Sequence, residues 1–150
     1  MSTVILLDTG LLGLITHPQA SEEARQCAQW LVSLSLKGFD IKIPEITDYE
    51  IRRELLRMNK VKSIKHLNDL KNVLGYVPLT TQTMLVAAEF WAEARKQGKP
   101  TADDKALDGD VILAAQASVI ESAGSTAIVA TTNVGHLSRF VNAKTWRDIS

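Results

Sequence analysis

The fold of this chain is decided by residues 106–117, which read Ala-Leu-Asp-Gly-Asp-Val-Ile-Leu-Ala-Ala-Gln-Ala. From Val111 onward the segment is apolar and rich in small residues, which is typical of a helix packed inside a protein. Two carboxylates, Asp108 and Asp110, come directly before it. The helix dipole stabilises acid in a first turn, so some acid is expected here on structural grounds alone. The pattern predicts a buried helix from about Asp108 to Ser122 with acid at its entrance.

The acidic content around this entrance exceeds what a helix start needs. Four aspartates gather in one short stretch, with Lys105 among them: Asp103, Asp104, Asp108 and Asp110. Carboxylates so close together repel one another unless solvent or a cation intervenes. Thr101 with Asp104 resembles a capping box, so we assign Asp103 and Asp104 to a cap and a solvated loop. The remaining excess is a first indication of a metal site.

Composition limits the class of protein. A chain of 150 residues with 45% hydrophobic content is predicted to form one domain over residues 1–150. Lys and Arg together number 17, as do Asp and Glu, so any nucleic-acid binding would depend on local patches. The single Cys27 excludes internal disulfides and indicates a reducing compartment. Without a basic leader, or an apolar run near the ~20 residues that span a membrane, the sequence predicts a cytoplasmic protein.

Short apolar runs alternate with helical patterns along the chain. The predicted strands are Thr3–Leu7, Asp40–Ile43, Gly75–Leu79 and Ala127–Ala130, with a last edge strand over Trp146–Ile149. Helices are predicted from Ser21 to Gly38, after Pro44, from Ser63 to Leu74, from Thr80 or Thr81 to Gly98, and from Asp108 to Ser122. Strands that alternate with helices form a mostly parallel sheet covered on both faces. The fold class is therefore α/β.

Oxygen-bearing side chains follow the predicted strands. Asp8 stands at the carboxyl end of the first strand, and Asn133 follows the strand that ends at Ala130. In open parallel sheets, ligands bind outside the carboxyl ends of the strands. Glu50 comes about two helical turns after the second strand, and Asp110 begins the central helix, so both can reach the same edge. Oxygen ligands without His or Cys suit the hard cations Mg²⁺ and Mn²⁺, which also bridge phosphate oxygens.

Four segments resemble, in order and spacing, the four motifs of PIN-domain ribonucleases, a family that includes the VapC toxins. They are Leu6–Gly10, Glu45–Arg53, Asp110–Ala117 and Thr131–Leu137, and together they cover nearly the whole chain. The resemblance implies a three-layer α/β/α sandwich, a divalent metal and endonucleolytic cleavage of RNA. A VapC-like protein would also be the toxin partner of a separately encoded antitoxin. The resemblance favours a homodimer, with Trp30 or Trp91 as interface anchors.

By this resemblance, Asp8, Glu50 and Asp110 carry over as metal-binding acids. Asn133 departs from the pattern, because many members have a further Asp there. An amide oxygen can coordinate a metal but adds no charge, so a second metal would bind more weakly. Asp108 is a substitute ligand if the helix starts between it and Asp110, because residues two apart on a helix point to nearly opposite sides. The predicted catalytic residues are Asp8, Glu50, Asp110, Asp108 and Asn133, and the predicted metal ligands are the first four.

A basic run over residues 51–67 begins directly beside Glu50. Its candidate RNA contacts are Arg52, Arg53, Arg57 and Lys60. Such side chains would hold phosphates of the RNA backbone without reading its bases. Alternatively, the run is a solvated helix face.

Two further readings compete with the nuclease. One is a catalytically weak module that keeps the fold and binds RNA or a protein partner, because the change at Asn133 has cost it turnover. Asn133, Thr131 and Thr132 fit turn chemistry as well as a site role. The other is a phosphatase of the haloacid-dehalogenase type, which is disfavoured because Gly10 stands where that chemistry needs a second acid.

Overall fold

The computed structural model describes residues 2–17, 21–98, 104–135 and 137–150. The described residues form a five-stranded sheet in the order β3-β2-β1-β4-β5, and every neighbouring pair is parallel. The strands are β1 (Thr3–Leu7), β2 (Asp40–Pro44), β3 (Gly75–Val77), β4 (Thr126–Thr131) and β5 (Ala143–Thr145). The prediction of an α/β fold with a parallel sheet is confirmed.

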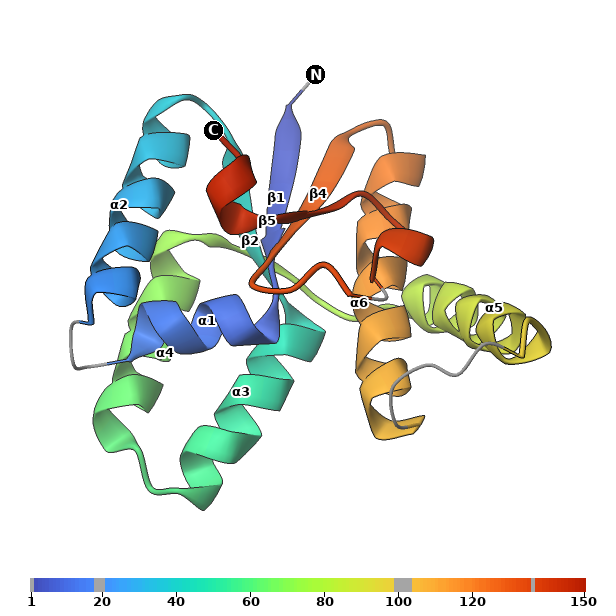
Figure 1. Ribbon diagram of the computed structural model, residues 1–150, viewed down its shortest axis with the longest axis horizontal. Helices are drawn as coiled ribbons and strands as arrows, with labels where there is room; N and C mark the ends of the chain where they lie inside the picture. The colour runs from blue at the N-terminus through green and yellow to red at the C-terminus, as the bar shows by residue number, and fades with distance from the viewer. Residues whose placement is uncertain (1, 18–20, 99–103, 136) are drawn as a thin grey trace.

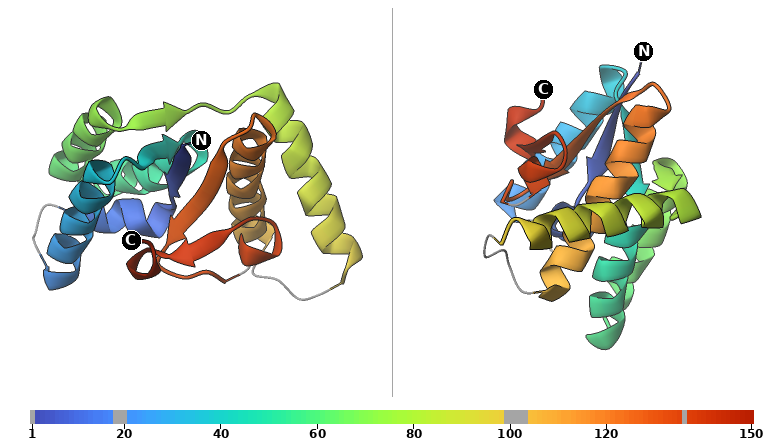
Figure 2. Two further views of the ribbon diagram at one scale, coloured as in Figure 1. Left: turned by 90° about the horizontal axis from the view of Figure 1, so that it is seen from above. Right: turned by 90° about the vertical axis from the view of Figure 1, so that its right-hand side faces the viewer.

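Helices cover both faces of this sheet (Figures 1 and 2). They are α1 (Thr9–Thr16), α2 (Glu22–Leu36), α3 (Glu45–Arg57), α4 (Val61–Val73), α5 (Thr81–Lys96) and α6 (Asp104–Ser122). Alternate residues of β1 separate the two layers. Ile5 and Leu7 pack among residues of α1 and α2, whereas Val4 and Leu6 pack against α6. This alternation makes the molecule a three-layer sandwich.

Helix α1 was not predicted. The first predicted helix begins at Ser21, but the chain continues directly after Asp8 into an eight-residue helix. The Asp8 carboxylate makes this start favourable, because its Oδ1 accepts a hydrogen bond from the backbone N–H of Leu11 at 2.9 Å. Helix α4 also begins earlier than expected, at Val61 instead of Ser63, and α6 begins at Asp104 instead of Asp108. The predicted capping box of Thr101 lies outside the described residues.

A buried glutamine in the segment 106–117 fixes α3 relative to α6. Gln116 is 1% exposed, its Nε2 donates to the Val77 carbonyl oxygen at 2.8 Å, and its Oε1 accepts from the Ile46 N–H at 3.3 Å. The second bond satisfies a free N–H in the first turn of α3, whose own start at Pro44 has no capping side chain. One side chain of α6 thereby ties together α3 and β3.

The predicted edge strand over Trp146–Ile149 is wrong. Strand β5 lies just before it, and Trp146–Asp148 is a short 3₁₀ turn. Trp146 is 4% exposed and packs edge-to-face on Trp30, with ring centroids 5.6 Å apart. The Trp30 indole N–H donates to the Ile149 carbonyl oxygen at 2.8 Å. The chain therefore turns back over α2 instead of continuing the sheet, and Trp30 holds this closure.

Helix α5 lies away from α1 and α2 and packs chiefly against α6 (Figure 2). The contact is built from small residues, with Ala87 and Ala94 of α5 buried against Val111 and Ala115 of α6. Trp91 of α5 stays 38% exposed. No helix among the described residues is long and apolar enough to cross a membrane.

Candidate active site

The site begins where β1 ends. The Asp8 N–H donates to the Ala130 carbonyl oxygen at 3.1 Å, which carries the pairing with β4 one residue past the strand. Its carboxylate is held on both oxygens, because Oδ1 accepts from the Leu11 N–H and Oδ2 accepts from the Thr131 hydroxyl. Burial raises the pKa of Asp8 above its ordinary value, the two hydrogen bonds oppose this rise, and the charge of Glu50 adds to it. Asp8 is thus a fixed, partly desolvated acid beside a second acid.

Glu50 reaches the same place from α3. Its Oε1 accepts a hydrogen bond from the Thr9 hydroxyl at 2.8 Å. Because Thr9 directly follows Asp8, the junction between β1 and α1 positions both carboxylates. Their proximity is reflected in the pKa of Asp8, which the Glu50 charge raises.

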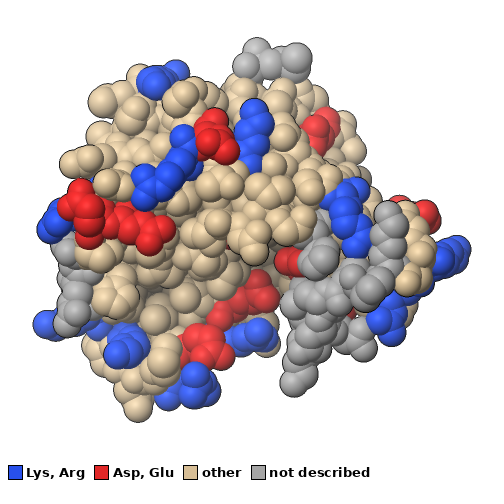
Figure 3. Space-filling model, in the orientation of Figure 1, with Lys and Arg blue, Asp and Glu red and all other residues tan. Residues whose placement is uncertain are grey.

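Gly109, in the N-terminal part of α6, packs against the Glu50 carboxylate. A β-carbon on Gly109 would lie 2.5 Å from Oε2 and 3.2 Å from Cδ of Glu50, so any side chain there would displace the carboxylate. Asp110 is the next residue of α6 and is half-buried. Asp8 and Glu50 therefore come to one edge of the sheet, and α6 packs beside Glu50 at Gly109. Figure 3 shows acidic side chains over α3 on this face of the molecule.

Asn133 does not contact Asp8 through its side chain. Its Oδ1 accepts from the Gly135 N–H at 3.1 Å, and its own N–H donates to the Thr131 hydroxyl at 3.0 Å. The amide therefore shapes the loop after β4, and Thr131 makes the contact with Asp8. This is the turn chemistry that the sequence left open for Asn133, while Thr131 serves the site.

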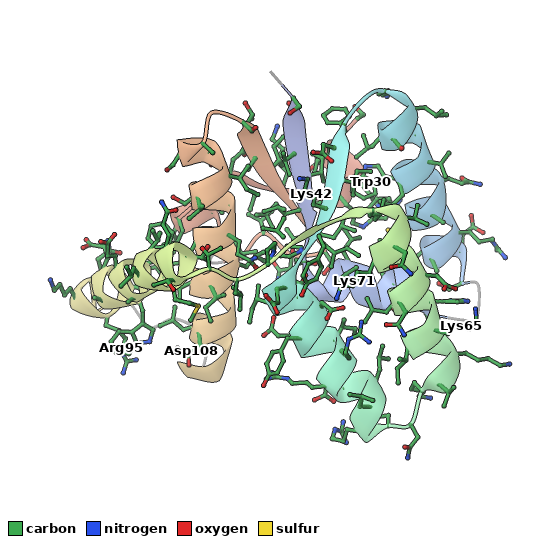
Figure 4. The ribbon with its side chains drawn as sticks, turned by 180° about the vertical axis from the view of Figure 1, so that it is seen from behind. Trp30, Lys42, Lys65, Lys71, Arg95 and Asp108 are labelled. Carbon is green, nitrogen blue, oxygen red and sulfur yellow. The ribbon has the colours of Figure 1, made fainter. Side chains whose placement is uncertain are left out.

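The structure places Asp108 apart from the other acids. It lines a hollow between α5 and α6 with Met84, Ala88 and Trp91 (Figure 4). Asp108 could share a metal with Asp110 only if the helix started between them. Because α6 already begins at Asp104, both residues lie within the helix and point to different sides. We therefore remove Asp108 from the candidate ligands.

Most of the basic residues predicted to contact RNA interact with other side chains of this protein. Arg52 forms a two-pronged pair with Asp48, at 2.9 Å and 3.2 Å, and donates to Asn68 of α4 at 2.8 Å. The Asp48 side chain is 9% exposed, so the ion pair within α3 is largely buried, and the Arg52–Asn68 hydrogen bond links α3 to α4. Arg57 pairs with Glu54 at 2.7 Å, and Arg53 lies 5.0 Å above the Tyr49 ring. Lys60 is exposed and forms no ion pair with the described residues.

The sequence analysis missed two residues that position the acids. Thr9 holds Glu50, and Gly109 leaves room for it. The role of Thr131 had a detectable signal, because aligning the first and fourth predicted strands pairs Leu7 with Ala130 and so puts Asp8 beside Thr131. No local sequence pattern predicts the contact of Gly109 with Glu50, because this contact depends on how α3 and α6 pack.

The donor set fits a hard cation. Asp8 and Glu50 offer carboxylate oxygens alone, and Mg²⁺ is commonly held by one or two carboxylates together with waters. The described residues contain no ready cluster of three His, Cys, Asp or Glu side chains around one point. The fit therefore rests on this pair of acids, with Asp110 as the neighbouring acid on α6.

No protein-family model and no curated protein sequence matches this chain. Its structure is similar to chains of toxin–antitoxin crystal structures. For VapBC2 from Rickettsia felis, bound to a DNA fragment from its promoter, the TM-score is 0.72 at 15% identity, over 95% of this chain and 98% of that one. For FitAcB from Neisseria gonorrhoeae it is 0.71 at 24% identity, over 97% and 99%. For VapBC-1 from nontypeable Haemophilus influenzae it is 0.64 at 18% identity, over 97% and 99%.

These similarities extend over nearly the full length of both chains, so they describe the whole fold and not one supersecondary unit. The protein has a PIN-like fold, with a parallel five-stranded sheet between helical layers, as in the VapC-type structures. At these identities, the likeness establishes the fold alone.

Proposed function

We propose that this protein is a divalent-metal-dependent endoribonuclease and the toxin of a toxin–antitoxin pair. The observation that carries the proposal is the meeting of Asp8 and Glu50 at the carboxyl end of β1, with the start of α6 packed against Glu50. In an open parallel sheet, this is the edge where ligands bind. A PIN-like fold with two carboxylates at that edge, and with Asp110 on the helix that packs against Glu50, supports phosphodiester chemistry.

Asp8 and Glu50, with Asp110 beside them, would hold Mg²⁺ or Mn²⁺. When bound, the metal supplies an activated water and stabilises charge on the departing oxygen of the RNA phosphate. The acids act as ligands and not as nucleophiles. Thr131 and Thr9 each donate a hydroxyl hydrogen bond to one carboxylate, which fixes its orientation before a cation arrives. The positive charge also favours the ionised form of Asp8, which burial disfavours.

The partners belong to the same proposal. The similar structures are toxin–antitoxin complexes, and a cognate antitoxin is the partner that they suggest for this chain. A homodimer would use α5, where Met84, Leu85 and Trp91 are exposed. Trp91 remains the candidate anchor, because Trp30 is engaged inside the protein.

The alternative function is a catalytically weak module that binds RNA or a protein partner. One observation favours it: Asn133 uses its side-chain oxygen within its own loop and brings no charge to the site. A site limited to Asp8, Glu50 and Asp110 would then bind a metal less strongly than an all-acid site of four.

Metal-dependent cleavage of single-stranded RNA separates the two functions. The wild-type protein should cleave RNA in Mn²⁺ and lose this activity in EDTA. Asp8→Asn is the matched variant, because Asn also caps helices and keeps α1 in place. It should melt within a few degrees of the wild type and lose cleavage. RNA binding without any cleavage in Mn²⁺ or Mg²⁺ would support the alternative.

A further inference from the structure

A second feature lies on the other side of Glu50. Helices α1, α3 and α4 enclose a hollow of about 390 Å³, large enough for a small organic ligand. Its apolar lining includes Ile51, Leu55 and Met58, and Gly13 of α1 leaves it open. Ile51 is the residue after Glu50, so the hollow begins one residue along α3 from the candidate active site.

The other end of the hollow is the first turn of α4. This helix begins at Val61, and its N-cap, Lys60, makes no capping hydrogen bond with its side chain. Lys60 and Ser63 both line the hollow, because residues three apart lie on one side of a helix. The positive end of the helix dipole therefore lies at this end of the hollow.

Ser63 supplies an independent sign that a ligand belongs here. The residue is 4% exposed, yet within the described part of the chain its hydroxyl has no hydrogen-bond partner. Described side-chain oxygens that are fully sealed from solvent all have partners, so the Ser63 hydroxyl must retain its small exposure, and the space it lines is the hollow. A largely buried hydroxyl without a partner is unfavourable unless something in that space binds it.

We propose that this hollow is a nucleotide subsite. The first turn of α4, with Lys60 and Ser63, binds a phosphate, and the base lies against Ile51, Leu55 and Met58. A helix N-terminus, a lysine and a hydroxyl together match the charge and the acceptor oxygens of a phosphate. This inference rests on the proposed function, because the hollow would then hold the nucleotide next to the phosphodiester at Asp8 and Glu50.

The first experiment measures binding without RNA cleavage, with three probes: adenosine 5′-monophosphate, adenosine and inorganic phosphate. The monophosphate should bind more tightly than either of the others, and its addition should shift the amide signal of Ser63 and the methyl signal of Met58 in NMR spectra. If adenosine binds as tightly as the monophosphate, no phosphate is recognised and the proposal fails. If inorganic phosphate binds as tightly, the apolar wall holds no base and the proposal also fails.

The most informative variant is Lys60→Asp, because it should preserve the stability of the protein while it weakens phosphate binding. Asp is a favoured N-cap residue, so the melting temperature should not fall. A carboxylate at this place repels phosphate, so affinity for the monophosphate should fall at least about tenfold. Lys37→Asp is the control with the same charge change, at the far end of α2 (Figure 1), and should leave this affinity within about twofold. Equal loss in both variants would overturn the subsite in favour of a general charge effect.

Ser63→Ala tests the hydroxyl alone and should weaken monophosphate binding about threefold to tenfold without unfolding the protein. Unchanged affinity would remove Ser63 from the subsite. Binding of a short RNA in EDTA, and its cleavage in Mn²⁺, distinguish the two proposals. If the wild type cleaves RNA and Lys60→Asp binds it equally well, the subsite alone fails. If the monophosphate binds but the wild type cleaves no RNA, the nuclease proposal alone fails.

Discussion

Two sides of the N-terminal part of α6, where the short acidic segment lies, contact different parts of the protein. On one side, Gly109 lies against the Glu50 carboxylate, and the absence of a side chain allows that contact. On the other side, Asp108, Val111 and Ile112 face α5 and line an open, mostly apolar hollow. Neighbouring acids thus lie in different environments because the helix turns by about 100° per residue. The comparison teaches that helical phase, and not the local number of acids, decides which side of α6 each aspartate faces.

The largest expected effect is on RNA cleavage by Asp110→Asn. Asp110 is half-buried in the second turn of α6, and Asn has nearly the same size and shape as Asp, so the protein should stay folded. Cleavage should fall by more than about 100-fold, since even the outer partners of metal ligands are worth ~10–100-fold. High Mn²⁺ should restore part of it if metal affinity is what was lost. A folded variant that cleaves RNA at the wild-type rate would contradict the role of Asp110.

Gly109→Ala tests the closed side of the entrance. The added methyl group would meet Glu50 Oε2 at 2.5 Å, so the carboxylate must move away from its Thr9 hydrogen bond. We expect cleavage to fall about tenfold, as for a disturbed metal ligand. Gly13→Ala is the matched stability control, because its β-carbon would meet only the Ile51 methyl at 3.6 Å. This control should gain ~0.4–1 kcal/mol in thermal or denaturant unfolding, and Gly109→Ala should gain less.

Metal binding should be visible in the melting temperature. A ligand at 100 times its dissociation constant stabilises the native state by ~2.7 kcal/mol, so millimolar Mn²⁺ should raise the melting temperature of the wild type. The pKa of Asp8 is raised above 3.8, so protons compete with the cation at higher pH than for an ordinary aspartate. The Mn²⁺-dependent rise should therefore be full near pH 8 and shrink as the pH falls. A melting temperature insensitive to Mn²⁺ and Mg²⁺ at pH 8 would count against a shared site.

The smallest effect is expected from Asp108→Asn on the open side. Its carboxylate lines the α5–α6 hollow and is exposed, so neither stability nor cleavage should change by more than about twofold. Measuring cleavage of the same RNA by this variant and by Asp110→Asn compares the two sides directly. Equal losses in both would mean that the start of α6 rearranges when RNA or metal binds.

The sequence by itself determined the α/β class, the parallel sheet and the place of the acids along it. Short apolar runs with β-branched residues can be buried on both faces, and helical periodicity between them leaves a parallel sheet as the outcome. The positions of Asp8 at the end of the first strand and of Glu50 on the helix after the second strand follow from that order. These features depend on residues close together in the chain, which is why their pattern is readable.

Only the tertiary structure decided which side chains meet. Thr131 reaches Asp8 through the register of β1 with β4, and Gly109 meets Glu50 through the packing of α6 on α3. The same packing turns Asp108 toward α5. The C-terminal residues after β5 fold back because Trp146 packs against Trp30, which is far away in the sequence. Each of these contacts depends on distances and helical phases set by many residues at once, and no local periodicity records them.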